Sequence, residues 1–284
     1  MRIPVLLPLV ALTACGANNG DTGVTGPVES GYATQLEAPA PDYARILREA
    51  PPQQFDFESL RREGTGSPPV NAKQVGETWL QRLQALDLVD GYGLSGKDDD
   101  TPIASFDLRL TADDFDAWVE ENGWEVPPHL RWSFVPPLTM PRVSEAAAEG
   151  IRIWPSSEQR TGLQLQAAGG GRIFLRDGCF YVQRRGQDEQ QLAWFHTETG
   201  LDVDDEGYYV LVNRVSGEVE GRLGEEFIWA SPNPITPGGP SMEELREACG
   251  DGEVFGVANP SAEAKMNTRY PPSAPDAMPP PGIE

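Results

Sequence analysis

The apolar positions in the middle of the chain recur first with the period of a helix and then with the period of a strand. In the segment 71–89 they fall on one face, which predicts an amphipathic helix whose apolar stripe needs a surface to cover it. The stripe consists of Val75, Trp79, Leu83 and Leu86. Asn71 with Gln74 is placed to cap the start of this helix. We expect the helix to dock on the protein's own core, with a binding partner as the alternative.

The segment that follows combines strand and helix signals. Residues 103–110 alternate between apolar and polar, which predicts a half-buried strand. Thr111 then stands at the N-cap of a predicted helix, and Gly123 follows its end. Two further strands are predicted at 130–134 and 151–154. This part of the chain is therefore predicted to form a β-α-β-β unit.

The second half of the chain is rich in short strand signals separated by turns. Asp177-Gly178 between two apolar runs is typical of a type I′ β-hairpin, because both turn positions need a positive φ. Three more short strands are predicted at 192–195, 208–212 and 226–230. Together they predict a small antiparallel meander or an OB-like partial barrel. The fold class that we expect is therefore α+β.

The N-terminus combines a positive charge, an apolar run and a cysteine. Arg2 precedes ten mostly apolar residues, 3–12, which would rise only about 15 Å as a helix against roughly 30 Å of hydrocarbon. The run ends in Leu12-Thr13-Ala14-Cys15. This box resembles the signal of bacterial lipoproteins, in which a peptidase cleaves before the cysteine and the thiol then carries a diacylglycerol. The resemblance implies lipidation of Cys15, and Gly16 in place of Asp implies transport to the outer membrane.

With this resemblance, the chain is expected to divide into five segments. Residues 1–14 would be a signal peptide, 15–40 the lipidated cysteine with a flexible tether, and 41–97 a helical segment with a Gly/Asp-rich linker. An α+β globular domain is expected at 98–260, followed by a disordered, proline-rich tail at 261–284. The membrane partner would be reached through the lipid anchor, with the domain facing the periplasm.

The charge of the chain argues against one class of partner. It carries 44 acidic and 22 basic side chains, a formal net charge of −22. Nucleic-acid binding needs a basic face that neutralises phosphates, so no nucleic-acid partner is expected. The segment 98–125 alone holds ten acids and one base, Arg109. Such a face would repel anionic lipid headgroups and hold the domain away from the bilayer.

Two cysteines remain if the first one is acylated. Cys179 and Cys249 then allow one disulfide in an envelope compartment, with two buried thiols as the alternative. Ser241 with Glu244 forms a capping box for a last helix that Gly250 ends, so a disulfide would tie this helix to the predicted hairpin. Neither cysteine has a neighbour at zinc-ligand spacing.

Two loops match ligand-binding patterns only in part. The segment 91–97 satisfies GxGxxG, but a helix precedes it and acidic residues follow it, so a flexible acidic linker is expected. The segment 202–207 begins like a calcium loop, but Asn213 stands where the bidentate Glu is required. We expect an acidic turn between strands, with weak calcium binding as the alternative.

The chain has two histidines, His129 and His196. His196 and Glu198 are two residues apart, which places an imidazole and a carboxylate on one face of a strand and matches half of the zinc deaminase signature; its cysteine half is missing. A metal site of two histidines and one carboxylate would need His129, His196 and Glu198 to converge, which nothing in the sequence indicates. We therefore expect no metal and no cofactor, and a strand-end His196 bonded to a nearby carboxylate.

These observations favour a lipid-anchored protein of the cell envelope, more specifically a non-catalytic binding or structural module with an envelope protein or the cell wall as partner. The alternative is a hydrolase of cell-wall glycan or peptide that uses His196 and Glu198 as general acid and base. The two hypotheses differ in what they require of these side chains: the enzyme needs both in one concave site.

Overall fold

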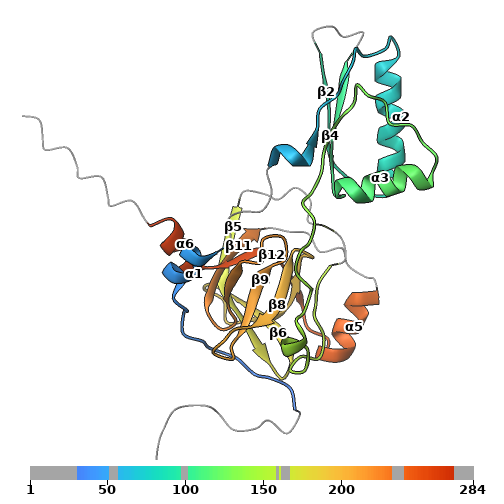
Figure 1. The fold of residues 1–284 in the computed structure, drawn as a ribbon. Coiled ribbons are helices and arrows are strands. Elements are labelled where there is room, and N and C mark those ends of the chain that lie inside the picture. The colour runs from blue at the N-terminus through green and yellow to red at the C-terminus, as the bar shows by residue number, and fades with distance from the viewer. Residues whose placement is uncertain are drawn as a thin grey trace, which may run out of the picture.

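The computed structural model describes residues 31–50, 57–96, 102–157, 160, 167–231 and 240–271 (Figure 1). Cys15 and the predicted signal peptide lie outside these residues. Helices and mostly antiparallel sheets are both present, so the fold belongs to the predicted α+β class. Two large hydrophobic cores account for most of the buried apolar side chains of the described residues.

One core lies between a four-stranded sheet and two helices. The sheet runs in the order β1-β4-β3-β2, with β3 parallel to β4 and the outer pairs antiparallel. Its elements are η1 (Phe57–Leu60), β1 (Arg61–Arg62), α2 (Ala72–Gln84), β2 (Val89–Ser95), β3 (Ile103–Leu108), α3 (Ala112–Glu121) and β4 (Arg131–Ser133). Trp79 of α2, Phe115 of α3 and Trp132 of β4 are buried together, and the ring centroids of the two tryptophans are 5.4 Å apart. Helix α2 therefore covers the protein's own core, as predicted.

Three of the four residues of the predicted stripe, Val75, Trp79 and Leu83, pack in the core, but the helix ends before the fourth. Leu86 lies beyond Gln84, the last residue of α2, and is 48% exposed. Gly76 also faces the sheet, and a Cβ at this position would come within 2.8 Å of the Ala104 methyl carbon. The helix thus approaches the sheet through a residue without a side chain, which the spacing of large apolar residues does not reveal.

The helix caps agree with the sequence in most places. The Thr111 hydroxyl accepts the Asp114 N–H at 3.1 Å, and Gly123 beyond the end of α3 has a φ of 62°. A further cap, at a helix not described above, is Asp42, which accepts the Arg45 N–H at 3.0 Å at the start of α1 (Tyr43–Glu49). The predicted cap at Asn71 is wrong, since its side chain makes no capping hydrogen bond.

Two further predictions, one of a strand and one of a linker, are also wrong. The segment 151–154 is not a strand, because only isolated bonds join it to its neighbours. The segment 91–97, predicted as a linker, forms most of β2 where it is described. Gly91 permits this pairing, since a Cβ there would lie 2.5 Å from Asp107 Oδ2. The glycine-rich segment that suggested flexibility thus belongs to a sheet.

The second core fills a closed barrel with the strand order β11-β12-β7-β6-β5. Its strands are β5 (Ala167–Arg176), β6 (Cys179–Arg184), β7 (Gln190–Phe195), β11 (Glu226–Ser231) and β12 (Val254–Ala262). Asp177 and Gly178 turn between β5 and β6 with φ values of 50° and 75°, which confirms the predicted hairpin. All pairs are antiparallel except β12 with β7. That parallel pair closes the barrel, which the sequence indicated only as a partial one.

A three-stranded sheet adds a second layer to the barrel core. It contains β8 (Thr199–Val203), β9 (Tyr209–Asn213) and β10 (Val219–Arg222), all antiparallel, and the short helix α4 (Glu145–Ala148) lies beside it. Leu201 and Leu211 carry their side chains into the barrel core. The predicted acidic turn lies between β8 and β9.

Residues 33–40, which we call the strap, lie along the barrel, which corrects the predicted flexible tether for this part of 15–40; residues 15–30 lie outside the described residues. Gln35 pairs with Leu175 of β5 as an isolated bridge and is 9% exposed. Its Nε2 donates to the carbonyls of Leu223 at 2.8 Å and Tyr209 at 3.0 Å, while its Oε1 accepts the Tyr209 N–H at 2.8 Å. Both N–H groups and the oxygen of the Gln35 side-chain amide are thus hydrogen-bonded to the protein backbone, which holds the strap in place.

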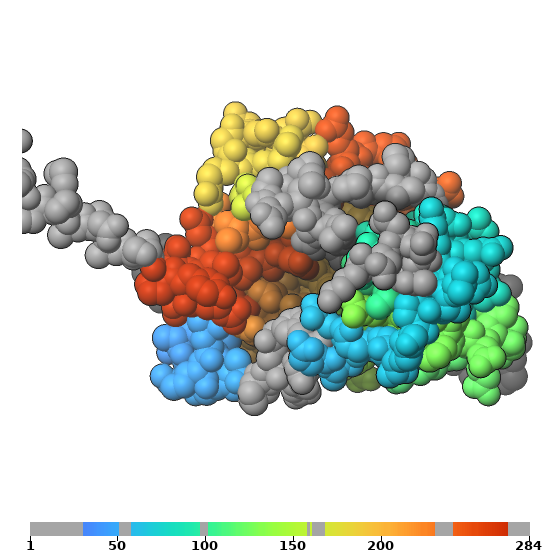
Figure 2. Space-filling view, turned by 90° about the horizontal axis from the view of Figure 1, so that it is seen from above, coloured from blue at the N-terminus to red at the C-terminus, as the bar shows by residue number. Residues whose placement is uncertain are grey.

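The predicted disordered tail at 261–284 begins instead with the end of β12 and a helix, and residues 272–284 lie outside the described residues. Helix α6 (Glu263–Arg269) follows β12 directly and packs against α1, so these two helices lie side by side on one side of the barrel (Figures 1 and 2). Lys265 of α6 is fully buried, and its Nζ lies 3.1 Å from a Glu218 oxygen and 2.7 Å from a Glu220 oxygen. These charge pairs thus attach the helix to β10 of the three-stranded sheet and the residue before it.

The last predicted helix is α5 (Pro240–Cys249), and Gly250 ends it with a φ of 90°. Ser241 lies inside the helix and not at its N-cap position. Cys249 forms a disulfide with Cys179 at the start of β6, with 5.8 Å between the Cα atoms. The predicted link between helix and hairpin is confirmed. Within the part of the chain that the structure describes, no helix has the length and apolar character needed to cross a bilayer.

Candidate functional site

The structure places His196 and Glu198 between β7 and β8, in a structural role. Glu198 Oε1 lies 3.1 Å from Arg160 Nε, and both side chains are 14% exposed. The Arg160 Nη2 also donates to the Pro136 carbonyl at 2.6 Å. The Glu198 carbonyl accepts the Arg214 N–H at 2.8 Å. Glu198 is thus the counterion of a largely buried guanidinium.

The two histidines occupy different environments and are not brought together. His129 is 5% exposed beside the first core, and burial lowers its pKa. Burial also lowers the pKa of His196, against an opposing effect of Glu198. No three metal-ligating side chains of the described residues are arranged to hold a metal ion, so the set His129, His196 and Glu198 does not form a site there. Neither of the two cavities described below is lined by these residues.

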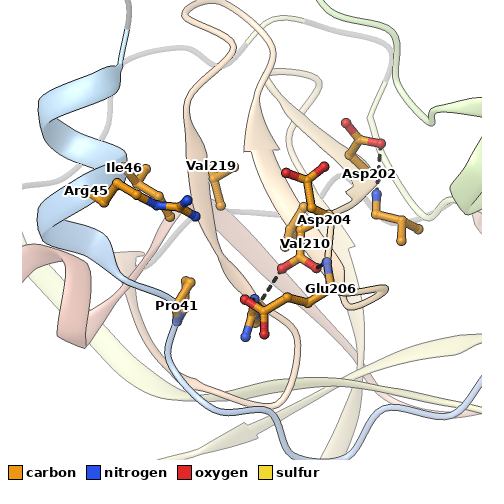
Figure 3. A pocket seen from close by; sticks show the side chains of 11 residues that line it. Pro41, Arg45, Ile46, Asp202, Asp204, Glu206, Val210 and Val219 are labelled. Carbon is orange, nitrogen blue, oxygen red and sulfur yellow. Dashed lines mark hydrogen bonds and ion pairs between the residues drawn. The ribbon is translucent and has the colours of Figure 1, made fainter.

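A cavity of about 300 Å³ lies between α1 and the strands β8, β9 and β10 (Figure 3). Its floor is apolar and comes from Ile46, Val210 and Val219. The other lining residues are Pro41, Arg45, Asp202, Val203, Asp204, Asp205, Glu206 and Arg222. One wall therefore carries the four acids of the turn that the sequence likened to a calcium loop, and the opposite wall carries Arg45.

The acidic wall of this cavity is built around one buried arginine. Arg222 is 2% exposed, and its guanidinium donates to Asp204 Oδ2 at 2.6 Å, to Glu206 Oε1 at 2.7 Å and to the Pro39 carbonyl of the strap at 3.2 Å. Burial alone would lower the pKa of Arg222, but the hydrogen bonds to Glu206 and Asp204 outweigh it and raise this pKa. The guanidinium also lies over the Tyr208 ring, 4.3 Å from its centroid. Protein groups therefore hold the turn.

Some charged groups that line the cavity take no part in the hydrogen bonds of Arg222. Asp204 Oδ1 accepts the N–H groups of Glu206 and Tyr208, each at 3.0 Å. Asp205 makes no hydrogen bond or ion pair within the described residues, and Glu206 uses only Oε1. Arg45 likewise has no carboxylate partner there, and its side chain extends from α1 toward Val219 in Figure 3. The cavity thus offers carboxylate acceptors on one wall and a guanidinium on the other.

A second cavity, of about 430 Å³, lies at the barrel end formed by β5, β6 and the start of β11. Arg172, Arg184 and Arg185 line it, together with Glu226 and the loop that follows β6. Arg185 pairs with Glu263 at 2.5 Å, and Arg172 pairs with Glu226 at 3.6 Å. Most of the positive charge at this end is therefore neutralised by the protein itself.

Sequence reasoning missed the first cavity because its walls come from distant parts of the chain. The acidic turn was recognised, but its partner Arg222 lies 18 residues from Asp204, and Arg45 lies in a helix far upstream. No spacing rule connects an isolated arginine with a turn that it meets only in the folded protein.

Comparisons of the chain with models of protein families, with curated proteins and with solved structures found no match.

Proposed function

We propose that this chain is a lipid-anchored protein of the bacterial cell envelope, facing the periplasm, with a non-catalytic binding or structural module as its body. The observation that carries the proposal is the sequence Leu12-Thr13-Ala14-Cys15 behind a short apolar run. A single acyl chain holds a protein to a membrane only weakly, whereas several chains hold it stably. The diacylglycerol on Cys15 would therefore anchor this acidic body, in the outer membrane by the identity of Gly16.

The disulfide supports an envelope location. Cys179 and Cys249 are bonded, and disulfides persist in oxidising compartments such as the bacterial periplasm. The bond joins α5 to the barrel across a sequence separation of 70 residues, which makes it a structural bond of the fold.

The docked strap supports a body held at a limited distance from the anchor. Sixteen residue steps separate Cys15 from Gly31, the first described residue, and a fully extended chain spans at most about 3.5 Å per residue. The body would thus lie within about 55 Å of the bilayer. Any partner that the body contacts would therefore lie on the same side of the membrane as the lipid anchor.

The engagement of Glu198 favours the binding module over the hydrolase. A general acid–base carboxylate must be free to exchange a proton with the substrate, and Glu198 is instead the counterion of Arg160. The cavity beside α1, with opposite charges on its two walls, has the character of a binding site.

Membrane fractionation with mass spectrometry tests the anchor. In cells producing the full chain, the protein is expected in the membrane fraction, with an N-terminal peptide that starts at Cys15 and carries the mass of the lipid. Cys15→Ser is expected to lack the lipid and to be recovered as soluble protein or as the uncleaved precursor, whereas Thr22→Ser, in the same segment but outside the lipobox, keeps the lipid and stays in the membrane. A cleaved Cys15→Ser chain that remains in the membrane fraction, or an original chain that still begins with Met1, contradicts the anchor.

The non-catalytic role is tested separately with purified cell wall. The full chain is expected to release no soluble muropeptide, measured by chromatography of the supernatant against a known wall hydrolase. Release of fragments that is abolished by Glu198→Gln or His196→Ala would overturn the binding role in favour of the hydrolase.

A further inference from the structure

The cavity beside α1 holds charges of both signs that do not pair with each other. Arg45 is an exposed side chain of α1, and Asp205 and Glu206 lie on the turn between β8 and β9. No ion pair within 4 Å joins Arg45 to these acids, although all three line the same cavity of about 300 Å³. Facing charges that are kept apart leave room for a molecule between them (Figure 3).

The two walls are fixed independently of any ligand. The acidic wall is held by Arg222, which occupies Asp204 and one oxygen of Glu206 and also binds the strap through the Pro39 carbonyl. The opposite wall is held by α1, whose Tyr43 hydroxyl donates to Glu225 at 2.6 Å. Preorganised walls reduce the ordering cost that a small ligand would otherwise have to offset.

From this arrangement we propose that the cavity binds a small zwitterion, an amino acid or short peptide with a free amino group and a free carboxylate. The ammonium group lies against Asp205 and the free oxygen of Glu206, and the carboxylate lies against the Arg45 guanidinium. Small apolar side chains of the ligand contact Ile46, Val210 and Val219 on the floor. The volume is at the lower end of the range for small-molecule sites, which fits one or a few residues of peptide.

A ligand of one sign does not fit both walls. A simple anion at Arg45 would face four acids of the lining, and a simple cation would leave the guanidinium unpaired. A metal ion is disfavoured too, because the described residues offer no group of three ligands arranged for it and Asp204 is engaged by Arg222. Only a ligand that carries both charges satisfies Arg45 and the acidic wall at once.

Calorimetric titration of the full-length protein in a nonionic detergent tests this proposal. The probes are alanine, alanyl-alanine and trialanine, whose charge separation increases in steps, and the best binder is then compared with its N-acetyl and its C-amide forms. Each capped form is expected to bind at least about tenfold more weakly, because it loses one charge-assisted contact. Salt is expected to weaken binding of the uncapped probe.

Substitution of two exposed side chains, Arg45 and Asp205, tests which wall of the cavity binds which end of the ligand. Arg45→Met is expected to abolish the preference for the free carboxylate over the amide while keeping the preference for the free amine. Asp205→Asn is expected to weaken the preference for the free amine only. Arg48→Met, on the same helix but outside the cavity lining, serves as the matched control with unchanged affinities. Circular dichroism confirms that each variant is folded.

Three results would overturn the proposal. The first is no heat of binding for any of the three zwitterions up to about 10 mM, tenfold above a dissociation constant of about 1 mM. The others are equal affinity for the free and capped forms, or a carboxylate preference that survives Arg45→Met. The measurement does not depend on lipidation, so its failure and a failure of the envelope anchor are distinguishable.

Discussion

The Tyr43 hydroxyl donates a 2.6 Å hydrogen bond to Glu225 Oε2, and the same oxygen accepts the Arg222 N–H at 2.7 Å. All three residues are buried, with Tyr43 at 3% and Glu225 at 7% exposure. This shared oxygen joins α1 to the turn before β11. It therefore couples the helix that carries Arg45 to the arginine that organises the acidic wall of the cavity.

Removing the phenolic hydroxyl is expected to destabilise the fold without changing the apolar packing of the ring. Tyr43→Phe leaves a buried carboxylate oxygen with one donor fewer, which costs about 1–3 kcal/mol of unfolding free energy. Urea denaturation of the two proteins measures this difference. Tyr32→Phe, at a 37% exposed tyrosine, is the control and is expected to stay within about 0.5 kcal/mol of the original protein. A Tyr43→Phe protein as stable as the control would contradict the coupling.

The Glu225 carboxyl should leave a signature in the pH dependence of stability. Burial raises the pKa of Glu225, although the hydrogen bonds from Tyr43 and Arg222 act in the opposite direction. The folded protein then takes up this proton at a higher pH than the unfolded chain, in which a Glu titrates near about 4.3. Its contribution to stability therefore increases as pH falls through the folded pKa toward about 4.3, and it is lost as pH rises.

Glu225→Gln removes this titration and keeps an acceptor for the Tyr43 hydroxyl. The difference in unfolding free energy, variant minus original protein, is expected to have its highest value at about pH 7–8. It is expected to decrease as the pH approaches about 4.3. Denaturant titrations at several pH values measure the difference, with Glu49→Gln on the exposed end of α1 as control. A difference that is independent of pH would show that Glu225 does not titrate as described.

Docking of the strap depends on the absence of a side chain at Gly224. This residue has a φ of 92°, and a Cβ there would lie 2.6 Å from the Glu37 backbone. Gly186 has a similar φ of 75°, but a Cβ added there would meet nothing within 4 Å, so Gly186→Ala carries only the left-handed backbone cost of about 1–2 kcal/mol. Gly224→Ala is expected to destabilise more than this and to speed hydrogen exchange at the Gln35 amide. Equal losses of stability in Gly224→Ala and Gly186→Ala would mean that the strap does not pack closely against Gly224.

Local patterns in the sequence account for much of this fold. The alternation at 103–110, the Thr111 cap and the Asp177-Gly178 turn each depend on residues close in sequence, and each is present in the structure. A turn that needs two positive φ values or a cap that needs one hydroxyl acts within a few residues. Such features can be recognised before any tertiary contact is known.

The features that were missed depend on contacts between distant residues. Gln35 looks like a linker residue until the carbonyls of Tyr209 and Leu223 meet its amide. The parallel pairing of β12 with β7 closes the barrel across some 60 residues, which no local period predicts. The same limit applies to the cavity, because Arg222 and Arg45 acquire their roles only from the chain's topology.

Loss of the disulfide is expected to weaken the fold substantially. In the chain-entropy model, a bond that closes a loop of 70 residues contributes about 4 kcal/mol by restricting the unfolded chain. The double variant Cys179→Ala and Cys249→Ala should therefore unfold at a clearly lower denaturant concentration, with the same effect when the original protein is reduced. Protection from hydrogen exchange should fall first in α5, which the bond ties to β6. Unchanged stability after verified reduction would contradict this assignment.

The ion pair of Arg160 with Glu198 gives a direct test of a structural against a catalytic role for Glu198. Both side chains are 14% exposed, so removing one partner leaves a largely buried charge unpaired, at a cost of up to about 3–5 kcal/mol. A double-mutant cycle with Arg160→Met and Glu198→Gln is expected to give a coupling energy of about 1–3 kcal/mol, measured by urea denaturation. The reference is Arg62 with Asp116, a pair at 2.6 Å whose side chains are 40% and 54% exposed, where the coupling is expected to stay below about 1 kcal/mol. A coupling for Arg160 and Glu198 no larger than this reference would mean that Glu198 is not held as a counterion, and its availability for proton transfer would then have to be reconsidered.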